Sequence, residues 1–143
     1  MTATSQEWAE RFDQRTAQHG SVAIDGAHLD AAAVADLGPS LATFQLGESG
    51  TGDHLISAAI AASSPGQYVE ALRSFVREEQ EHARLLAMVL DQFAMPRRTK
   101  HWSDRIFVLI RRLHSLRTEV LVLMVAEVIA LTYYGAVRRT GVE

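Results

Sequence analysis

The sequence predicts an all-α protein, and three observations support this fold class. Nearly half of the residues are apolar (48%) and only three of the 143 residues are proline, a composition typical of helical proteins. Three segments repeat apolar residues in alternating steps of three and four, which places them on one face of a helix. Gly, Ser and Pro residues separate these segments. We therefore expect one domain (1–143), an antiparallel bundle with three long core helices (37–140) preceded by an N-terminal helical extension (1–36).

The N-terminal extension should begin with an amphipathic helix over residues 5–18. Trp8 and Phe12 are one turn apart on its apolar face, so we expect both rings to pack against the body of the protein. A looser stretch with two glycines follows, and residues 30–37 should add a short helical turn.

Turn residues set the expected bounds of the first two core helices. Pro39 should open the first, because proline is favoured in the first helical turn. The segment Ser63–Gly66 should separate it from the second helix, which Ser64 is expected to cap. The second helix should end near Pro96, since proline interrupts a helix.

The third core helix should begin at a cap on Ser103 or Asp104 and run to about Arg139. Its stretch 120–137 is almost wholly apolar, so a short membrane span is an alternative. Glu127 lies at the centre of that stretch, where a charge costs about 2.5 to 3.5 kcal/mol on insertion scales. The apolar face also continues towards the N-terminus past several arginines, which favours a helix packed in the bundle.

Each core helix carries a carboxylate on its apolar face. The three faces are Leu41, Phe44, Glu48, Thr51, Leu55, Ala58 and Ala62; Tyr68, Leu72, Phe75, Glu79, His82, Leu86, Val89 and Phe93; and Leu109, Leu113, Leu116, Val120, Leu123, Glu127, Ala130 and Tyr134. A lone buried carboxylate costs several kcal/mol or takes up a proton. Three carboxylates that converge on one core therefore call for a shared cation.

The residue types indicate which cation the site would take. Glu79 and His82 are three residues apart, so both side chains reach one helix face and can bind one metal while the carboxylate bridges to a second. Carboxylate oxygen with imidazole nitrogen suits iron, manganese or zinc. Bundle proteins with two iron or manganese ions use one Glu from each of two helices and a Glu-x-x-His from each of the other two. Glu48 and Glu127 would supply the single carboxylates here.

Each candidate ligand has an alternative interpretation. Gly47, Gly50 and Gly52 surround Glu48, so a loop or bulge is an alternative to a continuous helix there. The same glycines either thin the wall beside a metal site or only allow close packing of helices. Glu79 and His82 could form an exposed pair within a charged run. Glu127, the fourth candidate ligand, could instead be a buried acid paired with an arginine from another helix.

The remaining polar residues are expected to have structural roles. Glu78 and Glu81 should be solvated, Glu119 should form a salt bridge beside the apolar face, and Tyr134 should pack in the core. Five histidines share no ligand spacing and fall off the apolar faces, so they are not included: His19, His28, His54, His101 and His114.

Three motifs carry a resemblance to a known family. The segments Phe44–Glu48, Arg77–Leu86 and Val125–Gly135 resemble the first three metal-ligand helices of the ferritin-like di-iron carboxylate superfamily, over roughly residues 37–140. The chain has no counterpart of the fourth ligand helix. The resemblance implies an oxidoreductase in which two iron ions, or manganese, activate oxygen or peroxide.

The same resemblance implies a role for each candidate ligand. Glu79 would be the bridging carboxylate, His82 a terminal imidazole, and Glu48 and Glu127 terminal or bridging oxygens. No catalytic residue beyond these ligands is assigned.

Composition excludes several function classes and leaves the partners open. A net charge of −3 without a dense basic cluster gives no reason to expect nucleic acid. The absence of cysteine excludes disulfides, thiolate metal sites and a cysteine nucleophile. The first residues do not read as a secretory signal, so we expect a cytoplasmic protein that does not bind a membrane.

Three long helices with apolar inward faces and no fourth helix leave an apolar groove between them. Large apolar patches are usually covered by another part of the protein or by a partner. A longer chain, a second copy of the chain or the N-terminal helix could cover it. We expect a missing fourth helix or a homo-oligomer. Iron binding or storage without an organic substrate and a metal-free helical interaction module are the alternative functions.

Overall fold

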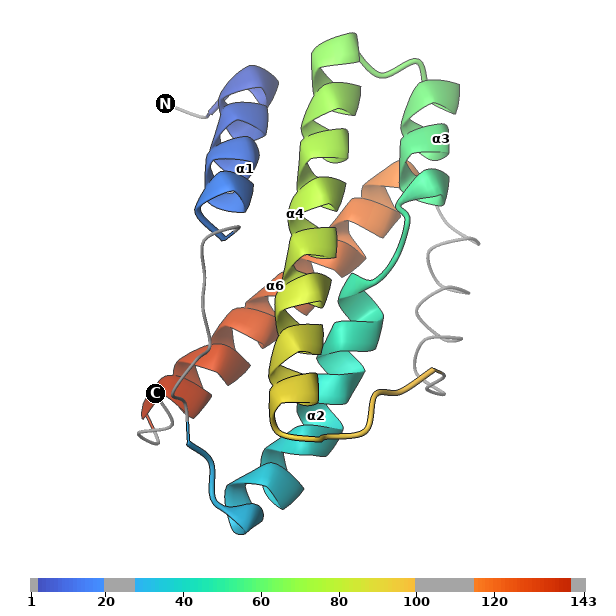
Figure 1. Cartoon of the computed structure of the whole chain (residues 1–143). Coiled ribbons are helices and arrows are strands. Elements are labelled where there is room, and N and C mark those ends of the chain that lie inside the picture. Colours follow the sequence, from blue (N-terminus) through green and yellow to red (C-terminus); the bar gives the residue numbers. More distant parts are fainter. Residues whose placement is uncertain (1–2, 20–27, 100–114, 140–143) are drawn as a thin grey trace.

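The computed structural model describes residues 3–19, 28–99 and 115–139 of the chain. Within these ranges the chain forms helices and no strand, which confirms the all-α class (Figure 1). The helices are α1 (Ser5–His19), α2 (Ala31–Glu48), α3 (Asp53–Ala61), α4 (Gly66–Gln92) and α6 (Leu116–Arg139). The N-terminal helix confirms the amphipathic segment predicted over residues 5–18.

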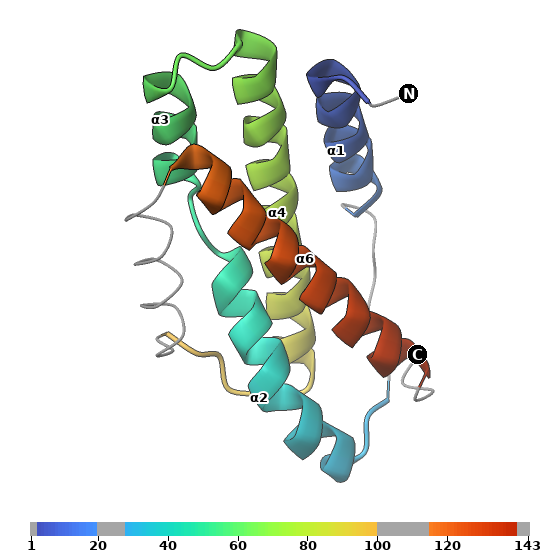
Figure 2. The same cartoon turned by 180° about the vertical axis from the view of Figure 1, so that it is seen from behind.

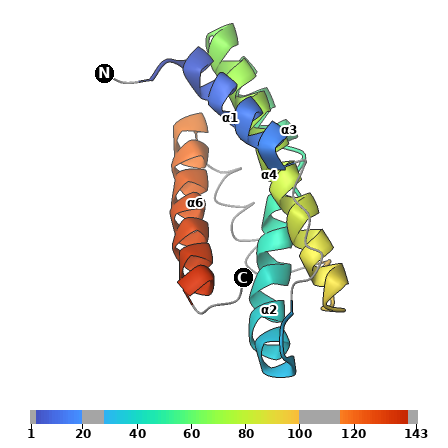
Figure 3. The ribbon, with the colours of Figure 1, turned by 60° about the vertical axis from the view of Figure 1, so that its left-hand side comes forward.

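The described helices are arranged around α4. Helix α1 packs along one side of α4, and α2 and α3 follow each other along the other side and run antiparallel to it (Figure 1). Helix α6 crosses this layer diagonally (Figure 2). Seen from the side, α6 forms a second layer by itself (Figure 3). The residues of α4 that face α6 therefore lie between the two layers.

Aromatic rings hold α1 against α4. The Phe12 ring meets the Phe75 ring edge to face, with 5.6 Å between their centroids. Trp8 stacks on Phe12 at 5.7 Å but remains 42% exposed. The prediction that this face packs on the protein is thus confirmed for Phe12, whereas Trp8 covers the edge of the contact.

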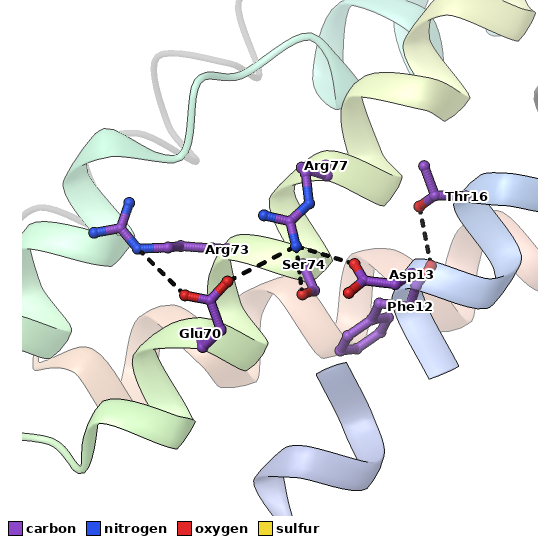
Figure 4. A network of polar contacts seen from close by, with 7 residues as sticks. All are labelled: Phe12, Asp13, Thr16, Glu70, Arg73, Ser74 and Arg77. Atoms are coloured by element: carbon purple, nitrogen blue, oxygen red, sulfur yellow. Dashed lines mark hydrogen bonds and ion pairs between the residues drawn. The ribbon is translucent and has the colours of Figure 1, made fainter. Parts of the chain in front are cut away.

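A polar network reinforces the same contact, and Arg77 of α4 is its centre (Figure 4). Its guanidinium donates hydrogen bonds to Asp13 of α1 at 3.0 Å and to the Ser74 hydroxyl at 2.8 Å. The Glu70 carboxylate lies 3.9 Å from Arg77 and 4.0 Å from Arg73. One guanidinium therefore links the two helices.

The first core helix starts earlier than predicted. Helix α2 begins at Ala31, where the Asp30 carboxylate accepts a hydrogen bond from the Ala33 amide at 2.7 Å and caps the N-terminus. Pro39 therefore lies inside α2 instead of opening it. The expected short turn and the expected first core helix form one element, because the Asp30 cap lies upstream of both.

The predicted apolar face from Leu41 to Ala62 does not lie on one continuous helix. Helix α2 stops at Glu48 and α3 begins at Asp53, so the loop weighed as an alternative is confirmed. Gly52 adopts the left-handed conformation (φ +70°), and a Cβ atom there would lie only 2.4 Å from a Val76 methyl carbon. Glycine is required at this position on both grounds.

The predicted bounds of the other core helices need smaller corrections. Pro65 occupies the N-cap of α4 without a side-chain hydrogen bond, so the predicted Ser64 cap is wrong. Helix α4 ends at Gln92, before the expected Pro96. Helix α6 begins at Leu116 and ends at the expected Arg139. The predicted caps Ser103 and Asp104 lie outside the described residues.

The largest apolar core joins α2, α4 and the C-terminal part of α6. Its buried members are Leu41, Ala42, Leu90 and Met95, and Phe93, Tyr133 and Tyr134 are among the rings packed against it. Phe44 stacks on Tyr133 with 4.8 Å between ring centroids. The prediction that Tyr134 packs in the core is confirmed.

Only one face of α6 packs against the rest of the described chain. The opposite face exposes the apolar side chains of Leu121, Met124, Val125, Val128, Ile129 and Leu131, each more than half exposed. The helix is long and apolar enough to cross a membrane, with a mean hydropathy of 2.1 over its most apolar stretch, of which 6% is buried. The core helix of a soluble protein can have the same length and hydropathy.

Candidate metal centre

The four predicted ligands come together between α4 and its neighbours. Glu48 is the last residue of α2, Glu79 and His82 lie one turn apart on α4, and Glu127 lies in the middle of α6. One oxygen or nitrogen atom each from Glu48, Glu79 and His82 lie within 4.8 Å of one another. The Glu127 carboxyl is close enough to Glu79 to raise the pKa of its carboxyl group. Three helices thus contribute to one polar cluster.

The separations within the cluster are close to those around a bound ion. Nδ1 of His82 lies 3.8 Å from Oε2 of Glu48 and 4.0 Å from Oε1 of Glu79, so these contacts are electrostatic and too long for hydrogen bonds. Two ligand atoms bound to one ion at about 2.1 Å are about 3 Å apart. The side chains would have to close by roughly 1 Å around a metal.

Glu48 carries the strongest indication of a missing cation. The residue is 8% exposed, and its Oε2 atom is buried without a hydrogen-bond partner among the described residues. A buried carboxylate oxygen without a partner costs several kcal/mol. Because this oxygen is on the side of the cluster that faces His82, a cation held between them would remove the cost.

Without a cation, two of the carboxyl groups hold their protons more tightly than usual. Burial raises the pKa of Glu79 to about 10, and the neighbouring Glu48 and Glu127 carboxylates add to the increase. Burial also raises the pKa of Glu127. The Glu48 carboxylate raises the pKa of His82, although burial of the imidazole opposes this. At neutral pH Glu79 is therefore a neutral acid between two other carboxyl groups, and a metal ion would displace its proton.

The alternative interpretations of these four residues receive little support. The side chains of Glu79 and His82 are 17% and 31% exposed, so they are not a fully solvated pair within the charged run. Among the described residues no ion pair joins Glu127 to an arginine. The carboxylates and imidazole fit iron, manganese or zinc by donor type.

A cavity of about 400 Å³ opens beside the cluster. Glu48 and Glu79 line it together with Phe75 of α4 and Leu123 of α6. Gly47 and Gly50 also line it, and a Cβ atom at either position would meet nothing within 4 Å. The glycines therefore leave open space beside two of the candidate ligands, as expected if they thin the wall of the site.

Glu119 and His54 form a second polar pair on the wall of this cavity. The Glu119 carboxylate is buried (3% exposed), and its oxygens lie 3.1 and 3.2 Å from Nδ1 of His54. The polar partner of Glu119 is thus His54, and the contact is the predicted salt bridge when the imidazole is protonated. This pair joins α3 to the N-terminal part of α6.

Sequence reasoning missed two residues next to the cluster. Glu78, expected to be solvated, is 4% exposed and pairs with Arg15 of α1 at 2.6 Å. The correction arises because α1 covers this side of α4. His19, which was not included among the candidates, places its ring centroid 5.2 Å from that of His82. No local spacing signals either role, since both depend on how α1 docks.

Comparison of the chain with protein-family models, with curated proteins and with solved structures finds no match. A function for this protein is therefore proposed from the geometry described above.

Proposed function

We propose that this chain is a metal-binding helical protein of the ferritin-like di-iron carboxylate kind, and that Glu48, Glu79, His82 and Glu127 are its metal ligands. One observation carries the proposal. Two carboxyl groups and an imidazole from α2 and α4 converge, the Glu127 carboxyl of α6 interacts electrostatically with the same Glu79, and the most buried carboxylate, Glu48, has an oxygen with no partner among the described residues. A cation satisfies that oxygen and neutralises the excess negative charge.

The positions of the side chains support distinct roles. Glu79 interacts with both Glu48 and Glu127, so it is the carboxylate best placed to bridge two ions. His82 interacts with Glu48 and would be a terminal ligand on the same ion. Iron is the proposed metal, and manganese fits the same donors. A pair of iron ions supplies redox chemistry with oxygen or peroxide, which makes the proposed activity that of an oxidoreductase.

The protein's own contribution would be binding, orientation and access. The Glu48 oxygen without a partner would accept a cation directly. Glu79 would release its proton when the cation binds. The cavity beside Gly47 and Gly50 gives a small oxidant or substrate a path to Glu48 and Glu79. Phe75 and Leu123 add apolar lining to the same cavity.

Ligand substitution tests this proposal. Glu48→Gln and Glu79→Gln keep the side-chain shape but remove the carboxylate that a metal ion would bind, whereas Glu70→Gln makes the same change at a surface position of α4 that is 59% exposed. After anaerobic loading with iron(II) and desalting, we expect both site variants to lose iron and Glu70→Gln to retain the wild-type amount. Equal iron retention by all three variants would show that the metal binds elsewhere.

A further inference from the structure

We propose that His19 of α1 is a second imidazole ligand of the metal centre, next to His82. This inference rests on the proposed function, because it adds a ligand to the same site. It also assigns a role to the N-terminal helix, which would then complete the site as well as cover it.

His19 has the environment of a ligand without its metal. It is the last residue of α1, and its Nδ1 atom is buried without a hydrogen-bond partner among the described residues. A buried polar nitrogen usually has a partner, and leaving it without one costs about 1 to 3 kcal/mol. The nearest described ring is that of a candidate metal ligand, His82.

The separation of the two rings agrees with coordination of a single ion. Their centroids are 5.2 Å apart and their planes are inclined by 49°, so the rings are not stacked. An imidazole nitrogen lies about 2.1 Å from a bound ion, which puts each ring centroid about 3.2 Å away and two centroids about 5 Å apart at a near-tetrahedral angle. The separation of the His19 and His82 rings therefore matches that of two imidazoles bound to one ion.

The docking of α1 fixes this placement. Three of the contacts between the parallel helices α1 and α4 lie along one line: Phe12 with Phe75, Arg15 with Glu78, and His19 with His82. Each contact spans the same sequence separation (75 − 12, 78 − 15 and 82 − 19 all equal 63). The contacts follow steps of three and four along both helices, so one face of α1 is in register with one face of α4. The register that buries Glu78 also places His19 opposite His82.

The added imidazole changes the ligand set in a chemically reasonable way. Glu48, Glu79, His82 and Glu127 alone provide three carboxylates and one nitrogen. With His19 the set has two nitrogens, the number that the two Glu-x-x-His motifs supply in bundle sites with two metal ions. Here both imidazoles would bind the same ion, so His19 replaces the nitrogen of a second Glu-x-x-His motif and not its carboxylate.

Cobalt(II) titration of the full chain tests the assignment, because the visible absorption of this ion reports on its coordination. The variants are His19→Ala and, as the matched control, His28→Ala at an exposed position. We expect His19→Ala to weaken cobalt binding at least about tenfold and to change the visible spectrum. His28→Ala should match the wild type in both respects. Circular dichroism of each variant checks that the helices are intact.

A measurement on the unsubstituted protein guards against misfolding of the variant. With ¹⁵N-labelled histidine and zinc(II), ring-nitrogen NMR signals of both His19 and His82 should shift in proportion to the bound metal. Cobalt binding by His19→Ala with wild-type affinity and spectrum, or a zinc-dependent shift at His82 but not at His19, would overturn the inference while leaving the proposed metal site intact. A folded wild-type protein that binds neither metal would overturn both.

Discussion

Substitution of Glu79 by glutamine should stabilise the metal-free protein, in a way that depends on pH. The pKa of Glu79 is about 10 in the folded chain, compared with 4.5 for the unperturbed group. Between these values the folded protein holds a proton that the unfolded chain has released. The free energy of unfolding therefore falls as pH rises, by about 1.4 kcal/mol per pH unit.

The magnitude follows from the pH interval. The stabilisation that the raised pKa of Glu79 gives the folded protein is fully present below about pH 4.5. About 3 kcal/mol of this stabilisation is lost by pH 7, about 2.5 pH units higher. The loss continues until about pH 10. Glutamine does not titrate, so the variant lacks this loss. We expect Glu79→Gln to exceed the wild type in stability by about 3 kcal/mol at pH 7, and by more at pH 9.

Urea unfolding of chelator-treated protein, followed by circular dichroism at pH 5, 7 and 9, measures the effect. Glu70→Gln is the control, because this carboxylate is exposed and its substitution should leave the pH dependence unchanged. A difference between Glu79→Gln and wild type that stays constant with pH would refute the argument. Iron(II) at about 1,000 times its dissociation constant should reverse the order at pH 7, since it adds about 4.1 kcal/mol to the protein that binds it.

Three further predictions concern the helices around the site. Arg15→Ala should lower the free energy of unfolding by about 2 kcal/mol or more in chemical denaturation, because it leaves Glu78 buried without its partner; a loss below 0.5 kcal/mol, as for a surface pair, would contradict this. Gly52→Ala should lower the melting temperature, since it combines a left-handed backbone with a steric overlap, whereas Gly50→Ala should not; equal melting temperatures would show that the loop adapts. The exposed apolar face of α6 should make the chain self-associate in detergent-free solution, and Leu131→Glu should convert the assembly to monomers in sedimentation velocity runs; a wild-type protein that requires detergent to stay in solution would instead indicate a membrane span.

Helical periodicity predicted which faces of the helices turn inward. Glu48 is buried, and Glu79, His82 and Glu127 are half-buried, in phase with the apolar residues of their helices. A charged residue in phase with apolar neighbours lies on the packed face of its helix. Which of these residues meet depends on how the helices dock, and the phases alone do not determine that.

The features that sequence reasoning missed depend on contacts between distant parts of the chain. The break between α2 and α3 is fixed by Gly52 against Val76, which no local pattern reveals. The burial of Glu78 and the position of His19 both follow from the register of α1 on α4. That register is set by Phe12 and Arg15 through partners far along the sequence. Local spacing predicts the faces of helices but not their partners.

Iron content per chain tests the central claim most directly. Wild-type protein purified without chelator, loaded anaerobically with iron(II) and desalted, should retain about two iron ions per chain, as the proposed dinuclear site requires. Less than about 0.2 iron per chain in a protein that is folded by circular dichroism would contradict the account. The carboxyl cluster would then be held together by protons, and the chain would be a metal-free helical module.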